Sequence, residues 1–362
     1  MSNEIYERLA SALDAIPPGY PETASRTELQ LLKKSFSEEE AELAGLMSRK
    51  FERISELATR VGWESDKVRD VLQSCLEKGL VIKRNIDDQE HYRLAPFMGV
   101  WYERLMGGEM RHDAKFAALF EQYMNEGAGE KIFSPRPGGF KVVPIRGALK
   151  PEQLEPYDDI DAHFARNERF AVIDCICQIE RDLVGHKCTK PLKRCAFTAL
   201  PPDTPLSENV LNREQAIELF TQLEEEGLVH NGFYGTPKGA KTPQFIGCCN
   251  CCNDCCPSLR AINDWGLEEG PQRSNYRASL KAENCIACGD CVERCQVHAI
   301  RQDEEGIAQI DRGKCLGCGL CVVKCPVNAI ELVPVSAEEW FHPPSSFAEW
   351  EERWLSQSGK TR

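Results

Sequence analysis

The chain has 362 residues, enough for two or three domains, and its 42% apolar and 28% charged residues are typical of a globular protein rather than a disordered or fibrous one. Its formal net charge of -13 opposes contact with phosphate backbones, so we expect no nucleic-acid partner. No apolar stretch approaches the roughly 18 residues of a membrane span, and the acidic N-terminus does not resemble a secretory signal, so the sequence predicts a cytoplasmic protein.

The chain contains 19 cysteines, and 18 of them lie after residue 170. The exception is Cys75, which falls within a helical pattern and is expected to fill the apolar side of that helix. Thiols stay reduced in the cytoplasm, so clustered cysteines there usually indicate metal binding or redox chemistry. The sequence therefore predicts a nearly cysteine-free N-terminal half and a metal-binding C-terminal half.

The N-terminal half shows helical spacing of apolar residues and one hairpin pattern. A first helix is predicted over 4–16 and ends at the prolines of 17–21. Four more helices are predicted, at 27–35, at 37–48, over the residues before Gly62, and from Ser65 to Gly79. The hairpin strands read LVIKR and HYRLA. This order of elements resembles a winged-helix domain over roughly residues 25–100.

The charges of this region argue against DNA binding. Residues 25–95 carry 13 Lys and Arg against 14 Asp and Glu, and the helix that would read DNA, 64–78, has no basic excess. A helix that enters a DNA groove normally has one. We therefore interpret the winged-helix-like region as a protein-docking or structural module.

Composition shifts divide the chain into segments, and the fold class they predict is α+β. Residues 134–156 are rich in proline and glycine, which is typical of a linker, and include one strand, FKVVPI. In the tail, Phe347, Trp350 and Trp354 share one helical face, which either packs on the core of the protein or docks a partner. The predicted segments are an N-terminal helix with a proline-rich connection (1–24), a winged-helix-like helical domain (25–133), the linker (134–156), a cysteine-rich domain (157–275), a two-cluster ferredoxin domain (276–333) and an aromatic amphipathic tail (334–362).

Two stretches near the C-terminus match at an offset of 30 residues and read NCIACGDCVERCQVHAI and KCLGCGLCVVKCPVNAI. Each contains C-x2-C-x2-C-x3-C, in which three cysteines surround one side of a [4Fe–4S] cluster and the fourth binds the other cluster. Zinc favours two C-x2-C pairs over two interleaved runs of four, so zinc and free thiols are the weaker alternatives. The predicted ligands are Cys285, Cys288, Cys291 and Cys325 for cluster 1, and Cys315, Cys318, Cys321 and Cys295 for cluster 2.

This repeat resembles the bacterial two-cluster ferredoxin family over residues 283–331. One position departs from the family pattern, because Gln296 stands where proline is usual, whereas Pro326 matches. Proline is not a ligand, so the departure concerns local geometry and not cluster binding. The resemblance implies a bacterial ferredoxin-like fold and two [4Fe–4S] clusters.

An earlier group of four cysteines follows the pattern C-x-C-x10-C-x6-C. The sequence AVID before it predicts a strand, so both thiolates of the C-x-C pair are expected near a loop. Lysine and arginine side chains crowd the second pair, where cations lower thiol pKa values and offset the negative charge of a cluster. We predict a third [4Fe–4S] cluster on Cys175, Cys177, Cys188 and Cys195, with zinc or unligated cysteines as alternatives.

A group of six cysteines, GCCNCCNDCC, follows a predicted helix over 213–226 and the predicted strands GLVH and QFIG. It repeats the C-x2-C-x2-C spacing of a cubane, but six thiols cannot all bind one cubane. Two are therefore free, bridge to a second centre, or share ligands with residues 175–195. A higher-nuclearity cluster, a zinc site, structural thiols and a disulfide switch are alternatives. We predict a fourth cluster on Cys249, Cys252, Cys255 and Cys256, with Cys248 and Cys251 as alternative ligands.

The order of these motifs over residues 20–332 is similar to that of 4Fe–4S ferredoxin-type proteins from anaerobic bacteria and archaea. The resemblance implies an intracellular electron carrier with two to four [4Fe–4S] clusters, placed between a donor and an acceptor oxidoreductase. The sequence has neither a P-loop motif nor a strand–GxGxxG–helix unit. Because clusters alone move single electrons, this favours an electron-transfer protein or an oxidoreductase subunit over a self-contained enzyme.

Two functions of other classes are alternatives. A redox-sensing winged-helix regulator would form a specific, salt-sensitive complex with DNA, which the charge balance opposes. An oxidoreductase subunit with a catalytic unusual cluster at 248–256 would turn over a substrate without a further protein partner.

Overall fold

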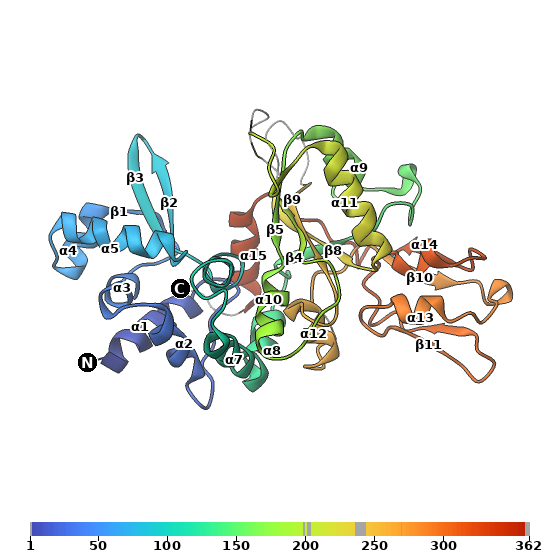
Figure 1. Ribbon diagram of the computed structural model, residues 1–362, viewed down its shortest axis with the longest axis horizontal. Helices are drawn as coiled ribbons and strands as arrows, with labels where there is room; N and C mark the ends of the chain where they lie inside the picture. The colour runs from blue at the N-terminus through green and yellow to red at the C-terminus, as the bar shows by residue number, and fades with distance from the viewer. Residues whose placement is uncertain (1, 198–199, 201–203, 236–243, 269, 359–362) are drawn as a thin grey trace. The chain divides into compact units, whose positions relative to one another are not determined.

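The computed structural model describes residues 2–197, 200, 204–235, 244–268 and 270–358 (Figure 1). Its content of 42% helix and 18% strand agrees with the predicted α+β class. The chain divides into two compact units, one made of Met1–Pro135, Ile179–Lys187 and Trp354–Arg362, the other of Arg136–Gln178 and Cys188–Arg353. The division after Pro135 falls within the predicted linker, and the finer division into six segments stays a prediction. None of the helices in the described parts of the chain has the length and apolar character that a membrane span requires.

The first unit is built of helices with one small sheet, as the sequence predicts. A capping box begins α3, where Ser37 Oγ accepts a hydrogen bond from Glu40 N and Glu40 Oε2 accepts one from Ser37 N. The sheet has the strand order β1-β3-β2, and β2 and β3 form the predicted antiparallel hairpin. The winged-helix-like assignment built on these elements stays a prediction. The elements are α1 (Ser2–Asp14), α2 (Thr27–Ser35), α3 (Glu38–Ala44), β1 (Glu52–Arg53), α4 (Ile54–Val61), α5 (Ser65–Glu77), β2 (Val81–Ile86), β3 (Gln89–Leu94), η1 (Phe97–Trp101), α6 (Tyr102–Gly107), α7 (Ala114–Tyr123), η2 (Met124–Ala128) and α8 (Gly129–Phe133).

Aromatic side chains at helical spacing form the core of this unit. The ring of Phe97 lies 4.8 Å, centroid to centroid, from those of Tyr20 and Trp101, and all three side chains are buried. Cys75 is fully buried on the apolar face of α5, as predicted. By sequence, Cys75 is the single cysteine of the first unit, and all cysteines of the predicted metal-binding motifs belong to the second.

The second unit is organised around a six-stranded antiparallel sheet with the order β4-β8-β9-β6-β5-β7. α9 and α11 pack against each other beside this sheet, with the rings of Phe164 and Phe220 5.1 Å apart (Figure 1). The register of β6 and β9 sets Cys195 opposite Cys249, which decides how the cysteine motifs meet. The elements are β4 (Phe140–Val143), η3 (Pro151–Gln153), α9 (Ile160–Arg166), β5 (Phe170–Asp174), α10 (Ile176–Leu183), β6 (Lys193–Phe197), β7 (Val210–Leu211), α11 (Arg213–Glu225), β8 (Val229–Gly235), β9 (Gln244–Cys251) and α12 (Pro257–Asn263).

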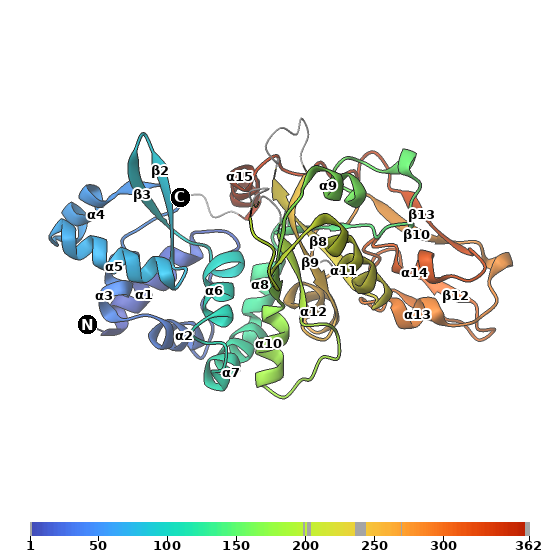
Figure 2. The same cartoon turned by 45° about the horizontal axis from the view of Figure 1, so that its top comes forward.

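The C-terminal repeat has the same local design twice. Gly289 and Gly319 adopt the left-handed backbone conformation before the short helices α13 and α14, which contact each other (Figure 2). Strand β10 pairs with β13, and β11 pairs with β12, both antiparallel. The elements of the repeat and its flanking strands are β10 (Tyr276–Leu280), η4 (Ala282–Asn284), α13 (Asp290–Arg294), β11 (Ile300–Gln302), β12 (Ala308–Ile310), α14 (Leu320–Lys324) and β13 (Ile330–Pro334), and the tail forms α15 (Phe347–Ser358).

The helices α10 and α15 test two local predictions, one for the C-x-C pair and one for the aromatic face of the tail. The C-x-C pair was expected near a loop, but α10 begins at Ile176, so Cys177 lies in a helix and that prediction is wrong for this residue. In α15, Trp350 and Trp354 are buried and Phe347 is 40% exposed. Trp350 Nε1 donates hydrogen bonds to the carbonyls of residues 137 and 138, so this part of the aromatic face packs on the protein itself.

Candidate metal centres

Two cavities in the C-terminal repeat are each lined by four cysteines. In both, three cysteines come from one run and the fourth comes from the other, because α13 and α14 carry Cys295 and Cys325 away from their own runs. The structure thus brings together the sulfur atoms of each predicted ligand set. The first cavity is lined by Cys285, Cys288, Cys291 and Cys325, and the second by Cys295, Cys315, Cys318 and Cys321.

Backbone amides point at the sulfur atoms of this repeat. Ala299 N donates to Cys295 Sγ at 3.1 Å and, 30 residues later, Ala329 N donates to Cys325 Sγ at 3.2 Å. Burial raises the pKa of the Cys318 thiol to about 12, so a thiolate there requires a metal to hold its charge. Four cysteines around each cavity, with backbone amides that donate to Cys295 and Cys325, fit a [4Fe–4S] cluster, whose potential such hydrogen bonds tune.

Gln296, the residue that departs from the ferredoxin pattern, has a definite role in the structure. Its Oε1 accepts a hydrogen bond of 3.0 Å from Asn253 N, and its carbonyl accepts one of 2.9 Å from Asn263 Nδ2. The residue after Cys295 is therefore tied to the turn between β9 and α12. The sequence marked this position as unusual but gave no sign of its partner.

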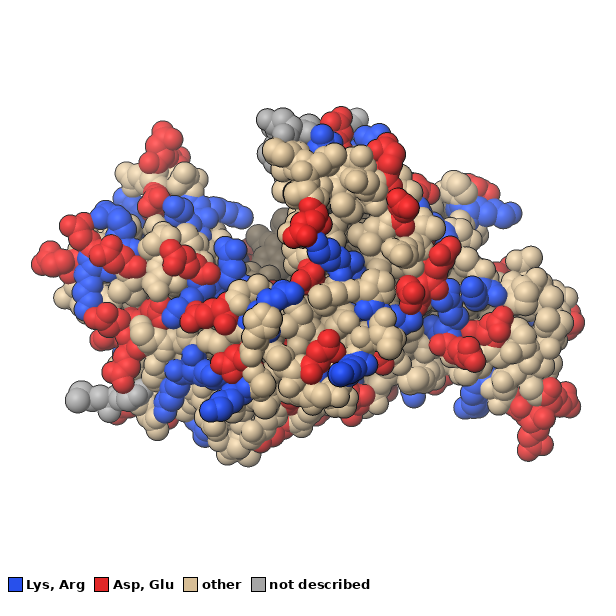
Figure 3. Space-filling model, in the orientation of Figure 1, with Lys and Arg blue, Asp and Glu red and all other residues tan. Residues whose placement is uncertain are grey.

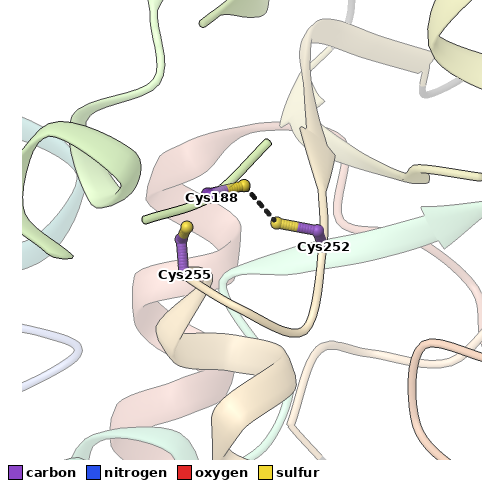
Figure 4. Close-up of side chains that lie close together, drawn as sticks. All are labelled: Cys188, Cys252 and Cys255. Carbon is purple, nitrogen blue, oxygen red and sulfur yellow. Dashed lines mark hydrogen bonds between the residues drawn. The ribbon is translucent and has the colours of Figure 1, made fainter. Parts of the chain in front are cut away.

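In the cysteine-rich region, three sulfur atoms from two motifs converge. Cys188 lies in the chain between α10 and β6, and Cys252 and Cys255 lie in the turn that connects β9 to α12 (Figure 4). The three Sγ atoms lie within 4.8 Å of one another, and those of Cys188 and Cys252 are 3.7 Å apart. Gln178 Nε2 donates to the carbonyls of Cys188 and Lys190, which fixes the Cys188 segment.

A second set of sulfur atoms lies around the pairing of β6 with β9, and we call it the strand-paired group. Cys195 Sγ lies 3.4 Å from Cys249 Sγ, the thiol of Cys175 makes hydrogen-bonding contacts with those of Cys177 and Cys195, and Cys251 hydrogen-bonds with Cys256. Side chains alternate along β9, so Cys248 points to the opposite face from Cys249 and Cys251. The members of the group are Cys175, Cys177, Cys195, Cys249, Cys251 and Cys256.

These contacts cut across the ligand sets predicted for the third and fourth clusters, each of which took all its members from one motif. Cys188 lies with Cys252 and Cys255 instead of with Cys175, and Cys195 lies against Cys249. The geometry favours ligands shared between the two motifs. The sequence left this alternative open, because six thiols in one motif cannot all bind one cubane. The two single-motif ligand sets stay predictions.

Arg194 is the cation that reaches both sulfur groups. Its side chain is 1% exposed, with Nη2 3.2 Å from Cys175 Sγ and Nη1 3.5 Å from Cys252 Sγ. Hydrogen bonding with Cys255 and the charge of Arg194 together outweigh the opposing effect of burial and lower the pKa of Cys252 to about 6. Of the other cations predicted here, Lys190 pairs with Glu226 and Lys193 with Glu208.

A polar network behind the cysteine run was not visible in the sequence. Asn250, between two cysteines, accepts a hydrogen bond from His230 through Oδ1 and donates to the carbonyl of Arg194 through Nδ2. His230 Nε2 lies 3.1 Å from Glu224 Oε1, and Arg146 pairs with the same carboxylate. This network orients the strand that carries Cys249 and Cys251.

Comparison with known proteins identifies one part of the chain. The family model described as a 4Fe-4S dicluster domain matches residues 278–332, the segment that contains all eight cysteines of the two cavities. No curated protein matches the chain. The match supports [4Fe–4S] cofactors and, with the cysteine-rich region, indicates an iron–sulfur role in electron transfer.

Proposed function

We propose that the chain is a ferredoxin-type electron-transfer protein that passes single electrons between a donor and an acceptor oxidoreductase. The observation that carries this proposal is the pair of cavities, each lined by four cysteines of interleaved runs, within the matched dicluster segment. A [4Fe–4S] cluster in each cavity would supply a one-electron redox centre. The proposed ligands are Cys285, Cys288, Cys291 and Cys325 for cluster 1, and Cys315, Cys318, Cys321 and Cys295 for cluster 2.

The surface at the first cavity supports docking of a redox partner. Cys288 is exposed, and Ile286 and Val327, which also line this cavity, are 59% and 37% exposed. Exposed apolar side chains around a redox site give a partner a contact from which water is excluded. We assign the docking of one oxidoreductase to this end of the repeat.

The arrangement of the apolar core supports a further iron–sulfur centre. One core cluster contains cysteines of both cavities together with Cys249, Cys251 and Cys256. Three members of the strand-paired group, Cys249, Cys251 and Cys256, therefore belong to the same apolar core as the dicluster segment. We propose this group, with Cys175, Cys177, Cys195 and Cys249 as ligands, as the place of a third [4Fe–4S] cluster.

The chemistry of the proposed ligands fits the compartment that we propose, the cytoplasm. Cysteines bind iron as thiolates, so closely spaced pairs such as Cys195 and Cys249 have to be kept from forming disulfides. Reduced thiols in such numbers persist where glutathione and thioredoxin systems operate.

Iron and sulfide counting on the anaerobically purified full-length chain tests the proposal. We expect about eight irons from the repeat and about four more from the third cluster. Cys288→Ala and Cys318→Ala should each remove about four irons, and Cys295→Ala should change the same EPR signal as Cys318→Ala. Cys75→Ala, at a buried position outside every group, is the matched control. An iron content that neither Cys288→Ala nor Cys318→Ala lowers would contradict the proposal.

Transfer itself is tested with a reduced viologen as donor and an oxidised flavoprotein as acceptor. The wild-type chain should accelerate transfer between them, and Cys288→Ala should lower this rate. Turnover of an organic substrate by the chain alone would instead favour an oxidoreductase subunit.

A further inference from the structure

Cys188, Cys252 and Cys255 form a donor group of a different kind from the two cavities of the repeat. Their Sγ atoms all lie within 4.8 Å of one another and point to a common centre (Figure 4). Among the described residues, the structure records no other group of three histidine, cysteine or carboxylate side chains whose ligand atoms come this close together. The eight cysteines of the repeat form no such group, although each set of four lines one cavity.

The spacing of these sulfur atoms fits one ion. Tetrahedral zinc with Zn–S bonds of about 2.3 Å places its sulfur ligands about 3.8 Å apart. The Sγ atoms of Cys188 and Cys252 are 3.7 Å apart. A cubane separates its thiolates by the width of four irons, and among the described residues neither the repeat nor the strand-paired group contains three sulfur atoms that all lie within 4.8 Å of one another. Cys252 and Cys255 also have the C-x2-C spacing of zinc sites.

The buried guanidinium of Arg194 gives independent support for negative charge at this point. Its side chain is 1% exposed, its Nη1 lies 3.5 Å from Cys252 Sγ and 4.0 Å from Cys188 Sγ, and its Nε has no hydrogen-bond partner in the described chain. A buried cation is stable only beside an anion. A divalent ion with three thiolates carries one excess negative charge, which Arg194 would balance.

We propose that Cys188, Cys252 and Cys255 bind a single zinc ion whose fourth ligand is an exchangeable water molecule. The structure records no fourth histidine, cysteine or carboxylate atom in the group within the described residues. Three protein ligands and a water are the arrangement of zinc sites that remain open to other ligands. The inference goes beyond electron transfer and does not depend on the iron content of the repeat.

Metal analysis of the full-length, anaerobically purified chain tests this site. We expect one zinc per chain in addition to iron, and zinc-edge X-ray absorption showing three sulfur atoms at about 2.3 Å and one lighter atom. Zinc bound by four sulfur atoms, or a chain without zinc after growth with both metals, would overturn the proposal.

Single substitutions locate the ion. Cys188→Ala and Cys255→Ala should each lose the zinc while keeping the EPR signals of the repeat, which also report that the variant is folded. Cys248→Ala, on the opposite face of β9, is the matched control and should keep both. Loss of about four irons in place of zinc would assign these cysteines to a cubane and overturn the inference. If a variant fails to fold, the zinc-edge X-ray absorption spectrum of the wild-type chain decides whether three sulfur atoms bind a zinc ion.

Discussion

Arg194 shows at the residue scale how one side chain can contact two groups of sulfur atoms. Its two terminal nitrogens reach Cys175 in the strand-paired group and Cys252 beside Cys188. A buried ion pair contributes little when compared with an apolar substitute, but removal of one partner leaves an uncompensated charge at a cost of about 3–5 kcal/mol. The sequence predicted cations near these thiolates, but four candidates lie between residues 187 and 194, and only the fold selects Arg194.

Glu224 is a residue whose ionisation should make stability depend on pH. Burial alone raises the pKa of its carboxyl, but hydrogen bonds from His230 and Arg146 outweigh burial and lower the pKa from 4.5 to about 2. A carboxyl whose pKa is lower in the folded than in the unfolded chain stabilises the fold at pH values above the unfolded pKa of about 4.5. This stabilisation is lost as the pH falls from about 5 towards 2. The shift corresponds to about 3 kcal/mol at pH 7.

Glu224→Gln is therefore expected to lower the melting temperature at pH 7 by roughly 5–10 °C. Because the wild-type chain itself loses this stabilisation in acid, the difference between the two proteins should narrow between pH 7 and pH 4. Circular dichroism melts at both pH values measure this difference. Glu218→Gln, at an exposed position of the same helix, is the control and should change little. A difference that stays constant with pH would show that Glu224 acts through packing and not through its charge.

At the element scale, the turn between Cys315 and Cys318 packs closely against the chain that leads into β10, and this contact positions the second run of the repeat. Gly317 has a φ of +71°, and a Cβ at this position would overlap the Ser274 hydroxyl and the Tyr276 carbonyl. The same approach allows Ser274 Oγ to donate to the Gly317 carbonyl at 2.9 Å and Ala278 N to donate to Cys315 Sγ at 3.4 Å. The turn between Cys315 and Cys318 therefore tolerates only glycine at this point.

Gly317→Ala should separate this turn from β10 and remove about four irons, those of cluster 2, while the signal of cluster 1 persists. The repeat supplies its own control, because Ala287 occupies the equivalent position of the first run and also has a positive φ, of 58°. Ala287→Gly should keep both clusters. Iron counting and EPR on the two variants check this, and full occupancy in Gly317→Ala would refute the packing argument.

The elements differ in how far the sequence determines them. The runs of the repeat were predictable because three ligands of each cluster are local and the spacing is repeated 30 residues later. The contact between Cys195 and Cys249 was not predictable, because it depends on the register of β6 against β9. Strands this far apart in the sequence carry no local signal of their pairing. The helix that contains Cys177 was not predictable either, because the C-x-C spacing fits a loop and a helix N-terminus equally well.

At the scale of the whole molecule, charge sets the limits on partners. The net charge is -13, and on the face drawn in Figure 3 Lys and Arg are interspersed with Asp and Glu. The cations of α5 and the lysine directly after it are already paired. Lys67 pairs with Glu39 at 2.6 Å, Arg69 pairs with Asp66 at 2.6 Å, and Lys78 pairs with a carboxylate of α3. A helix that releases counterions from DNA needs cations that are not neutralised in this way.

We therefore expect the full-length chain to show no saturable binding to a mixed-sequence DNA duplex in fluorescence anisotropy at physiological salt, at concentrations up to about 10 µM. The double variant Glu39→Gln, Asp66→Asn releases Lys67 and Arg69 from their ion pairs, so it should gain weak binding that disappears as salt is raised. That gain would show that the pairing, and not the shape of the helices, prevents contact with DNA. A tight, sequence-specific complex of the wild-type chain that changes with the redox state of its metal centres would instead favour a regulator, because only base contacts and a coupled conformational change produce both properties.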